Sequence, residues 1–414
     1  MSSALIPIFI GTTGLVGMFT KFIGPITVSP LIILLAASSV DMCVERISKH
    51  WVSVIQAIAL FIVVLYLADW KTPLPSIRKR KFSITRHNIF GQYPYLIAIL
   101  VSWGFCLFLT LANLTPPDSA ARLDKNGTLE VIKHADWFTV PYPGEFGTPK
   151  FHAGLFFAFV LSAMTSVFES VGDYHAAARV SDERAPATHA INRGIIAEGV
   201  GSLFGGLLGP GVGITTHTEN IGVIGITKVS SRATMVTAGV LLICLGCFTK
   251  LGAVLSTIPD PLVGGVLASS MAMVCGIAIA NLQQVDLTLS RNIAIIGFSI
   301  MVGLIVPRYF AQYPVHTGLR LYGVETLDQV LHVLFTLPMF VGALTACILD
   351  NTVQGATREQ RGLRSRGLVY DFGESGVDIY AFPPLLMKII KKFPILTNLP
   401  FIPREKRRQM CDVI

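Results

Sequence analysis

Charged side chains are scarce in this sequence. Lys, Arg, Asp and Glu together make up 14% of its 414 residues, whereas hydrophobic residues make up 52%, and the mean hydropathy is +0.62. So little charge beside so much apolar surface is typical of an integral membrane protein rather than a soluble domain. The sequence therefore predicts an all-α polytopic membrane protein.

Motifs for covalent chemistry are also lacking. The cytoplasmic segments hold no nucleophile–base pair, no metal-ligand cluster and no phosphate-binding glycine loop, so we expect neither an enzyme nor a cofactor. The seven cysteines lie mostly in apolar runs rather than in a disulfide framework. Cys244 and Cys247 have the spacing of a metal or redox pair, but they stand without a second pair in mid-helix, and we interpret them as small packing residues.

Long apolar runs are what the sequence does have. About eleven stretches approach the roughly 17 to 25 residues that cross a bilayer as a helix. No cleavable signal peptide is evident, because the first stretch has no basic leader, so we expect the helices themselves to direct insertion. The stretches cover residues 3–19, 24–40, 52–69, 96–113, 152–168, 194–209, 213–227, 233–249, 259–280, 292–306 and 330–349.

Basic loops set the expected orientation. The densest of them, Lys71–Arg86, belongs in the cytoplasm by the positive-inside rule. Counting spans from there places the Arg179–Arg193 loop, the Lys228–Arg232 turn and the arginine-rich C-terminal tail in the cytoplasm as well. The loop after Asn113 is then outside, and it carries sequons at Asn113 and Asn126. Asn126 is the better glycosylation candidate, because Asn113 adjoins the membrane.

The net charge of +8 follows from these cytoplasmic loops, which face anionic lipid. We therefore expect no nucleic-acid partner. In the stretch Tyr380–Ile402 the apolar runs are too short and too often interrupted by charge to span a membrane. We expect this stretch to lie on the inner membrane surface. The Arg404–Arg408 cluster that follows suits the same surface.

A glycine-rich run, Gly201–Gly213, interrupts the apolar pattern. It lacks the flanking strand and the Lys-Ser/Thr ending of a nucleotide loop, so we interpret it as a discontinuous transmembrane element that exposes backbone groups near the midplane. The polar run Thr215–Asn220 follows directly. In an alternative interpretation, Thr218 and Glu219 only cap the next helix.

Two carboxylates lie in a second apolar segment. Glu169 follows a long, largely apolar run, and Asp173 comes four residues later, so both belong on one helix face. Carboxylates in membrane-length apolar stretches usually mark a transport site. The alternative for Asp173 is a cytoplasmic end-of-helix position, salt-bridged to Arg179.

Glu219–Lys228 fits a short signature: Gln, Glu or Pro, then Asn, any residue, Gly, four residues, Thr, and Lys, Arg or Gly. On this signature and on further stretches in the same order, the sequence resembles the nucleobase/ascorbate transporter family (xanthine/uracil permease-like), particularly its animal sodium-dependent branch, solute carrier family 23. The further stretches are Phe168–His175, His189–Gly194, Ile258–Pro259, Val263–Gly265 and Leu349–Thr352.

The resemblance implies a fold of fourteen segments in two inverted repeats, with short strand elements at broken helices. A core domain would hold the substrate and move against a gate domain in an elevator-like cycle. The expected parts are core helix 1–20, gate helices 21–114, extracellular loop 115–151, core helices 152–250, gate helices 251–350 and cytoplasmic tail 351–414.

Site roles also follow from the resemblance. Glu169, Glu219 and Asn220 match substrate-binding positions, and Thr218 and Gly222 stand beside them. Asp173, together with Glu169, matches the cation-coupling positions. We expect sodium as the coupling ion, bound at Asp173, with proton coupling through Glu169 as the alternative.

The first signature position bears on the substrate. The resemblance associates Pro with ascorbate carriers and Gln or Glu with nucleobase carriers, and this chain has Glu219. Ascorbate is an anion, so a second carboxylate near Glu169 repels it unless a cation screens the pair. A nucleobase is therefore the expected small-molecule substrate, and ascorbate the alternative.

The resemblance begins at the family's fourth segment, and the span count leaves Met1 outside the cell. We therefore expect an incomplete gene model, or else a non-transporting partner of full-length family members. The resemblance also implies a multi-pass protein of the plasma membrane and a homodimer formed through gate domains.

Overall fold

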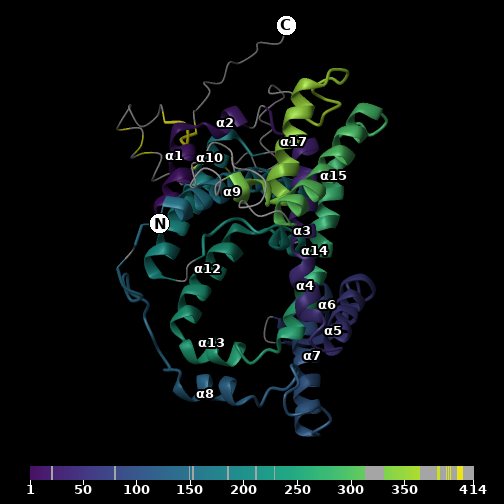
Figure 1. The fold of residues 1–414 in the computed structure, drawn as a ribbon. Helices are drawn as coiled ribbons and strands as arrows, with labels where there is room; N and C mark the ends of the chain where they lie inside the picture. Colours follow the sequence, from purple (N-terminus) through teal and green to yellow (C-terminus); the bar gives the residue numbers. More distant parts are fainter. Residues whose placement is uncertain are drawn as a thin grey trace. The chain divides into compact units, whose positions relative to one another are not determined.

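The described part of the chain is mostly helical (Figure 1). The computed structural model describes residues 1–19, 22–78, 81–148, 150–151, 153–183, 186–209, 212–227, 229–312, 331–363, 380–382, 388, 390, 392 and 399–403. This confirms the prediction of a helical protein. The elements are η1 (Ser2–Ala4), α1 (Leu5–Thr13), α2 (Val16–Phe19), α3 (Pro25–Ser38), α4 (Val40–Ile47), α5 (Val52–Phe61), η2 (Ile62–Tyr66), β1 (Thr72–Arg78), β2 (Lys81–His87), α6 (Ile89–Gln92), α7 (Pro94–Leu111), α8 (Asn126–His134), α9 (Ala153–Val180), α10 (Thr188–Leu208), α11 (Thr218–Thr227), α12 (Arg232–Cys247), α13 (Thr249–Leu255), α14 (Asp260–Leu282), α15 (Ser290–Gln312) and α17 (Pro338–Thr352).

Five helices of the described residues are long and apolar enough to cross a membrane. A sixth span is possible if α12 and α13, which meet at a bend of 92°, count as one. Several other apolar stretches form shorter helices, among them α11 with 10 residues and α17 with 15. The helices therefore support a multi-pass membrane protein. The five are Pro25–Ile47, Pro94–Leu111, Leu155–Ala178, Asp260–Leu282 and Ser290–Gln312.

The chain divides into two compact units. The first comprises residues 1–34, 143–217 and 278–414, and the second comprises residues 35–142 and 218–277. In the first unit α1 packs along α10, and α15 packs along α17 (Figure 1). Val171 and Ile195 help to join α9 to α10 in one apolar cluster, whereas Ile26 and Ile295 belong to another beside α15.

Glycines permit the close packing of α3, α15 and α17. A Cβ added at Gly342 or at Gly303 would overlap the same atom, Leu34 Cδ1. Small residues let membrane helices approach closely, where dispersion rather than water exclusion drives packing. Leu34 of α3 therefore packs into a recess lined by glycines of α15 and α17.

The second unit has its own apolar cluster, in which Val52 of α5, Cys106 of α7 and Leu262 of α14 are buried. At the N-terminus of α14, Asp260 accepts hydrogen bonds from Lys49 Nζ at 2.7 Å and from Arg46 Nη1 at 3.3 Å. The basic loop of this unit forms an antiparallel hairpin of β1 and β2, with Arg78 opposite Lys81 next to its tip. Lys79 and Arg80 lie outside the described residues.

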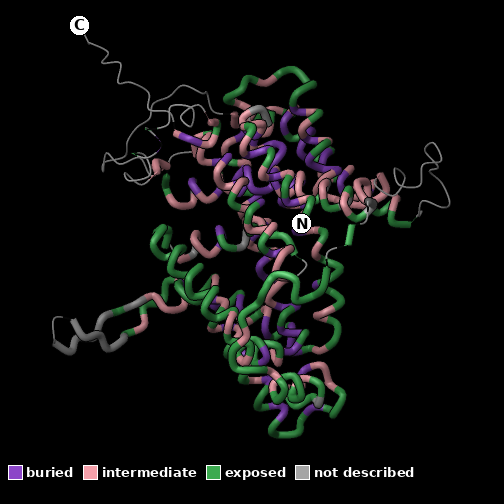
Figure 2. Tube along the Cα trace, turned by 90° about the vertical axis from the view of Figure 1, so that its left-hand side faces the viewer, coloured by how far each residue is buried: buried purple, intermediate pink, exposed green. Residues whose placement is uncertain are grey.

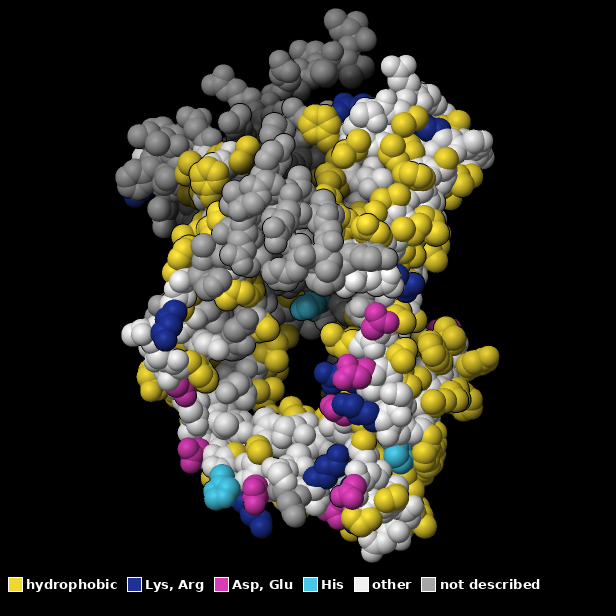
Figure 3. Space-filling view, viewed as in Figure 1, with side chains coloured by type: hydrophobic (Ala, Val, Ile, Leu, Met, Phe, Trp, Pro, Cys, Tyr) yellow, Lys and Arg dark blue, Asp and Glu magenta, His cyan; other side chains and the backbone are white. Residues whose placement is uncertain are grey.

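Helices such as α7 and α15 have one buried and one exposed face, since buried positions (purple in Figure 2) alternate along them with exposed ones (green). By contrast, α12 has no buried residue. The outward faces are strongly apolar, and hydrophobic side chains cover the outer side of α15 (yellow in Figure 3). Exposed apolar surface of this extent marks contact with a membrane or a partner. The residues on α15 are Ile293, Phe298, Met301, Ile305 and Tyr309.

The loop after α7 holds both sequons. Asn113 Oδ1 accepts a hydrogen bond from Arg122 Nη2 at 3.2 Å, and Thr115 of the same sequon is buried. The hydrogen bonds from Arg122 also lower the pKa of the Asp124 carboxyl. Asn126 opens α8, and its side chain lies outside the described ones. Glycosylation of Asn126 therefore stays a prediction.

Candidate functional site

Helix α9 carries the two predicted carboxylates. Glu169 is 9% exposed and Asp173 is 1% exposed, and the four-residue spacing places both on one face of the helix. Asp173 lies about two turns before the end of α9 at Val180, and its alternative interpretation, a cytoplasmic end-of-helix position paired with Arg179, stays open. The side chain of Arg179, its suggested partner, lies outside the described ones.

Helix α3 meets α9 beside Asp173. A Cβ on Gly172 would overlap Val28 Cγ1, so only glycine permits this approach. The neighbours of Val28, Thr27 and Ser29, are 3% and 0% exposed. Among the described residues their hydroxyl oxygens have no hydrogen-bond partner. Buried hydroxyls without a partner are uncommon in native structures, and a bound water or ion is one explanation for them.

A neighbouring face of α9 binds a third carboxylate, Glu198 of α10. Ser170 Oγ donates to Glu198 Oε2 at 2.6 Å, and the Tyr174 hydroxyl donates to Oε1. Thr216 donates to Ser170 Oγ at 3.0 Å and to Glu198 Oε1 at 3.4 Å. Thr215 accepts from Ser166 Oγ at 2.7 Å. Two helices and the extended chain before α11 thus meet in one polar network.

Local sequence explains why this network forms. A Cβ on Gly194 would lie 2.5 Å from the Tyr174 hydroxyl, so glycine at this position of α10 makes room for the tyrosine. Helix α10 ends at Leu208, followed by Gly209 with a φ of +90° that glycine adopts without strain. Ser202 Oγ then donates to Ile214 O at 3.0 Å and accepts from Ile214 N at 2.8 Å, which holds the extended segment against α10.

The glycine-rich run therefore does end a helix, but the helix ends later than the composition of the run suggests. Gly201, Gly205 and Gly206 lie within α10, and the break comes at Gly209. Residues 210 and 211 lie outside the described ones. The helix persists because its interior glycines pack closely, with a Cβ at Gly206 lying 2.8 Å from Met1 Cγ.

The remaining predicted site residues belong to the second unit. Helix α11 begins at Thr218, Asn220 is exposed, and Gly222 packs against Met273 and Ile277 of α14. The side chains of Thr218 and Glu219 lie outside the described ones. The structure thus brings Glu169 and Asp173 together on α9, and places the signature residues together on the first turns of α11.

Sequence reasoning missed Glu198, although the signal was available. Glu198 lies in the apolar and glycine-rich stretch from Ile195 to Gly201, and the rule that flagged Glu169 applies to it equally. Within the described residues, no group of three or more His, Cys, Asp or Glu side chains is arranged to hold a metal ion. Cys244 and Cys247 are free thiols, and Cys244 is exposed.

Replacing Glu198 by glutamine is expected to loosen the α9–α10 contact. A carboxylate accepts all three hydroxyl hydrogen bonds, whereas an amide keeps one acceptor oxygen and turns a donor toward the others. Loss of one such bond costs about 1.5–3 kcal/mol, which should appear as a lower melting temperature of the purified protein. Glu183→Gln, the same change at an exposed loop position, is the control. Equal melting of both variants would contradict this account of the network.

Known proteins are similar to this chain over nearly its whole length. A family model described as "Permease family" matches residues 1–312. The chain belongs to this family. Solute carrier family 23 member 2 of Homo sapiens is 39% identical over 97% of the chain and 62% of its own length. Solute carrier family 23 member 1 of Mus musculus is 34% identical, over 97% of the chain and 67% of its own length.

A plant relative extends the comparison. Nucleobase-ascorbate transporter 11 of Arabidopsis thaliana is 31% identical over 87% of the chain and 54% of its own length. The resemblance to nucleobase/ascorbate transporters, seen first in separate motifs, is thereby confirmed over nearly the whole chain. The chain spans about three fifths of the length of the human relative.

Proposed function

We propose that this permease-family chain is a secondary active transporter that takes up nucleobases of the purine or uracil type, coupled to sodium. One observation carries the proposal. Two carboxylates, Glu169 and Asp173, are buried on one face of α9, and burying ionisable groups at membrane depth is costly unless they serve a pathway or site.

Glu169 is the proposed substrate ligand. A carboxylate accepts N–H hydrogen bonds from the edge of a purine or pyrimidine, and charge-assisted bonds of this kind are about twice as strong as neutral ones. Glu219 and Asn220, with Thr218 and Gly222, are proposed to complete the recognition from α11. The name of the plant relative includes both nucleobase and ascorbate, so it supports these two substrate classes without choosing between them.

Asp173 is the proposed sodium ligand. A hard cation prefers oxygen ligands. The hydroxyls of Thr27 and Ser29, which have no hydrogen-bond partner among the described residues, flank the point where α3 touches α9 at Gly172. Sodium beside Asp173 would also offset the repulsion between neighbouring carboxylates. A proton on Glu169 is the competing coupling ion.

Movement in this proposal is elevator-like. Core helices, which include α1, α9 and α10, carry the substrate against gate helices, which include α15 and α17. The protein is proposed to act in the plasma membrane as a homodimer. Apolar outer faces such as that of α15 supply surface for lipid or for the second protomer.

Binding tests the substrate class without requiring transport. The purified chain is heated with uracil, hypoxanthine or ascorbate, each in sodium buffer and in buffer where choline replaces sodium. A ligand that binds only the folded protein raises the melting temperature by mass action. The proposal expects stabilisation by a nucleobase that needs sodium. Stabilisation by ascorbate alone would favour an ascorbate carrier instead.

Substitution of Glu219 by proline is expected to weaken nucleobase binding by about tenfold or more, because it removes an acceptor and the backbone N–H of the second residue of α11. The apparent affinity from the stabilisation curve measures the change. Val229→Pro, in the exposed turn after α11, is the control for a proline near this helix. Unchanged nucleobase affinity in Glu219→Pro would remove Glu219 from the site.

A further inference from the structure

A glutamine is buried in the second unit, where the proposed function gives it no role. Gln56 of α5 is 0% exposed. Its amide offers two N–H donors and an oxygen that accepts hydrogen bonds, yet neither Nε2 nor Oε1 has a hydrogen-bond partner among the described residues. The large majority of buried side-chain polar atoms in native structures are hydrogen-bonded to protein or to water. The surroundings of Gln56 therefore have to supply a partner.

Helices α5 and α7 pack against each other in antiparallel directions. Just after η2, which continues α5, the chain lies beside α6, the short helix that leads into α7. There a Cβ on Gly91 would lie 2.5 Å from Ala68 O. At the opposite end, Val52 of α5 and Cys106 of α7 belong to one buried cluster. The first turns of α5 thus lie beside the later turns of α7.

Ser102 of α7 lies at the level of Gln56. Gln56 comes one turn after Val52 and Ser102 one turn before Cys106, so in an antiparallel pair both fall at one level of the contact faces. Ser102 is 1% exposed, and its Oγ has no hydrogen-bond partner among the described residues. Thr110, one turn beyond Cys106, instead donates to Cys106 O at 2.8 Å. Ser102 makes no such bond to its own helix, so its hydroxyl is available to a ligand.

Helix α14 covers Gln56 from a third side. A Cβ on Gly265 would lie 3.0 Å from Gln56 Cγ and 2.8 Å from Ser53 O, so glycine permits an approach that a larger residue would obstruct. Among the described residues of this unit, no charged side chain is buried. Gln56 is therefore enclosed by three helices in neutral surroundings.

The chemistry of these surroundings selects a small neutral ligand. An ion would lack a counter-charge, and burying an unpaired charge is costly. An apolar molecule would leave the amide and the hydroxyl without partners. Water both donates and accepts, and a buried water typically makes about three hydrogen bonds to polar groups that are otherwise unsatisfied.

We propose that Gln56 and Ser102 bind a water molecule that joins α5 to α7 beside Gly265 of α14. The amide and the hydroxyl each form a hydrogen bond with this water, so that a polar contact, and not apolar packing alone, holds the helices together at this level. The site does not rest on the proposed function, since it needs neither a substrate nor a coupling ion.

Thermal unfolding of the purified full chain tests the polar link. Gln56→Met and Ser102→Ala are each expected to lower the melting temperature by about 2 °C or more, because each leaves the opposite group and the water short of a partner. The double variant removes both polar groups, so its loss is expected to be smaller than the sum of the two. Gln92→Met, at an exposed position of α6, is the control. Strictly additive effects, or a higher melting temperature in Gln56→Met, would overturn the site.

Radiolytic labelling distinguishes a bound water from a direct hydrogen bond between the two side chains. A short X-ray exposure converts a bound water into a hydroxyl radical, which oxidises the side chains next to it. Cys106, which is 0% exposed and one turn from Ser102, is expected to be oxidised at least about threefold faster in the parent than in the double variant. Cys43, also buried in this unit, is the control and should react equally in both proteins. Equal oxidation of Cys106 in both proteins would overturn the bound water.

Discussion

Glu169→Gln is expected to reduce nucleobase uptake to less than about 1% of that of the unchanged chain, with surface abundance intact. The amide keeps the shape of the side chain but offers one acceptor oxygen and presents an N–H₂ group to the donors of the substrate. Each hydrogen bond to a charged group contributes about 1.5–3 kcal/mol, and a nucleobase edge offers two N–H groups. In the variant one of these bonds is replaced by two donors facing each other, and the other becomes a weaker bond to a neutral oxygen. The two changes together correspond to a loss of about two orders of magnitude.

Labelled uptake together with surface biotinylation measures this effect. Glu183→Gln makes the same chemical change on an exposed loop residue and should transport normally. A melting temperature close to that of the parent would show that Glu169→Gln is folded. Retention of more than half of the uptake would show that Glu169 does not bind the substrate.

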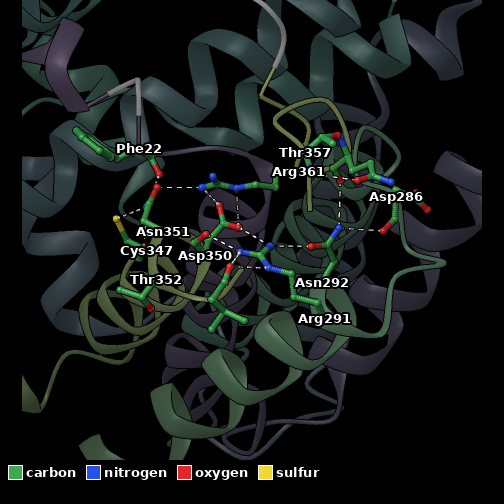
Figure 4. A network of polar contacts seen from close by, with 12 residues as sticks. Phe22, Asp286, Arg291, Asn292, Cys347, Asp350, Asn351, Thr352, Thr357 and Arg361 are labelled. Atoms are coloured by element: carbon green, nitrogen blue, oxygen red, sulfur yellow. Dashed lines mark hydrogen bonds and ion pairs between the residues drawn. The ribbon is translucent and has the colours of Figure 1, made fainter. Parts of the chain in front are cut away.

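Asp350→Asn is expected to destabilise the protein by about 3–5 kcal/mol, because it leaves two arginines facing a neutral side chain at a buried position. The Asp350 side chain is 0% exposed, and those of Arg291 and Arg361 are 10% and 15% exposed. This one carboxylate of α17 joins Arg291 of α15 to Arg361, which follows α17 in the sequence (Figure 4).

Thermal unfolding in detergent and surface abundance both report this loss. Asp118→Asn, at an exposed position of the loop after α7, is the matched control. Replacing Arg291 and Arg361 by methionine in the Asp350→Asn background should restore part of the stability. Removing all three charged side chains costs far less than removing only the carboxylate, which leaves two mostly buried arginines without a counter-charge. Parent-like melting of Asp350→Asn would contradict the role given to this cluster.

The carboxylates of α9 were predictable because two simple rules apply to them. A charge within a long apolar run needs a reason, and a spacing of four residues fixes a common helix face. Glu169 and Asp173 satisfy both and are buried as expected. Glu198 satisfies only the first rule, and its partners Ser170, Tyr174 and Thr216 come from distant parts of the sequence that no local pattern connects.

The position of the helix break was harder to predict. The composition of Gly201–Gly213 gives it a low helix propensity. The chain nevertheless stays helical until Gly209, because tertiary packing overrides local propensity. The contact of Arg193 with Tyr380 shows the same limit. Nothing in the residues around Tyr380 predicts a contact with Arg193, since cation–π and backbone hydrogen bonds leave no periodic signal in the sequence.

The most direct test of the account is uptake of labelled uracil, hypoxanthine and ascorbate by cells that express this chain, with sodium present or replaced and surface abundance measured. The account predicts nucleobase uptake that falls to background when sodium is replaced. Absence of uptake at normal surface abundance would contradict it and would favour a non-transporting subunit that assembles with longer family members.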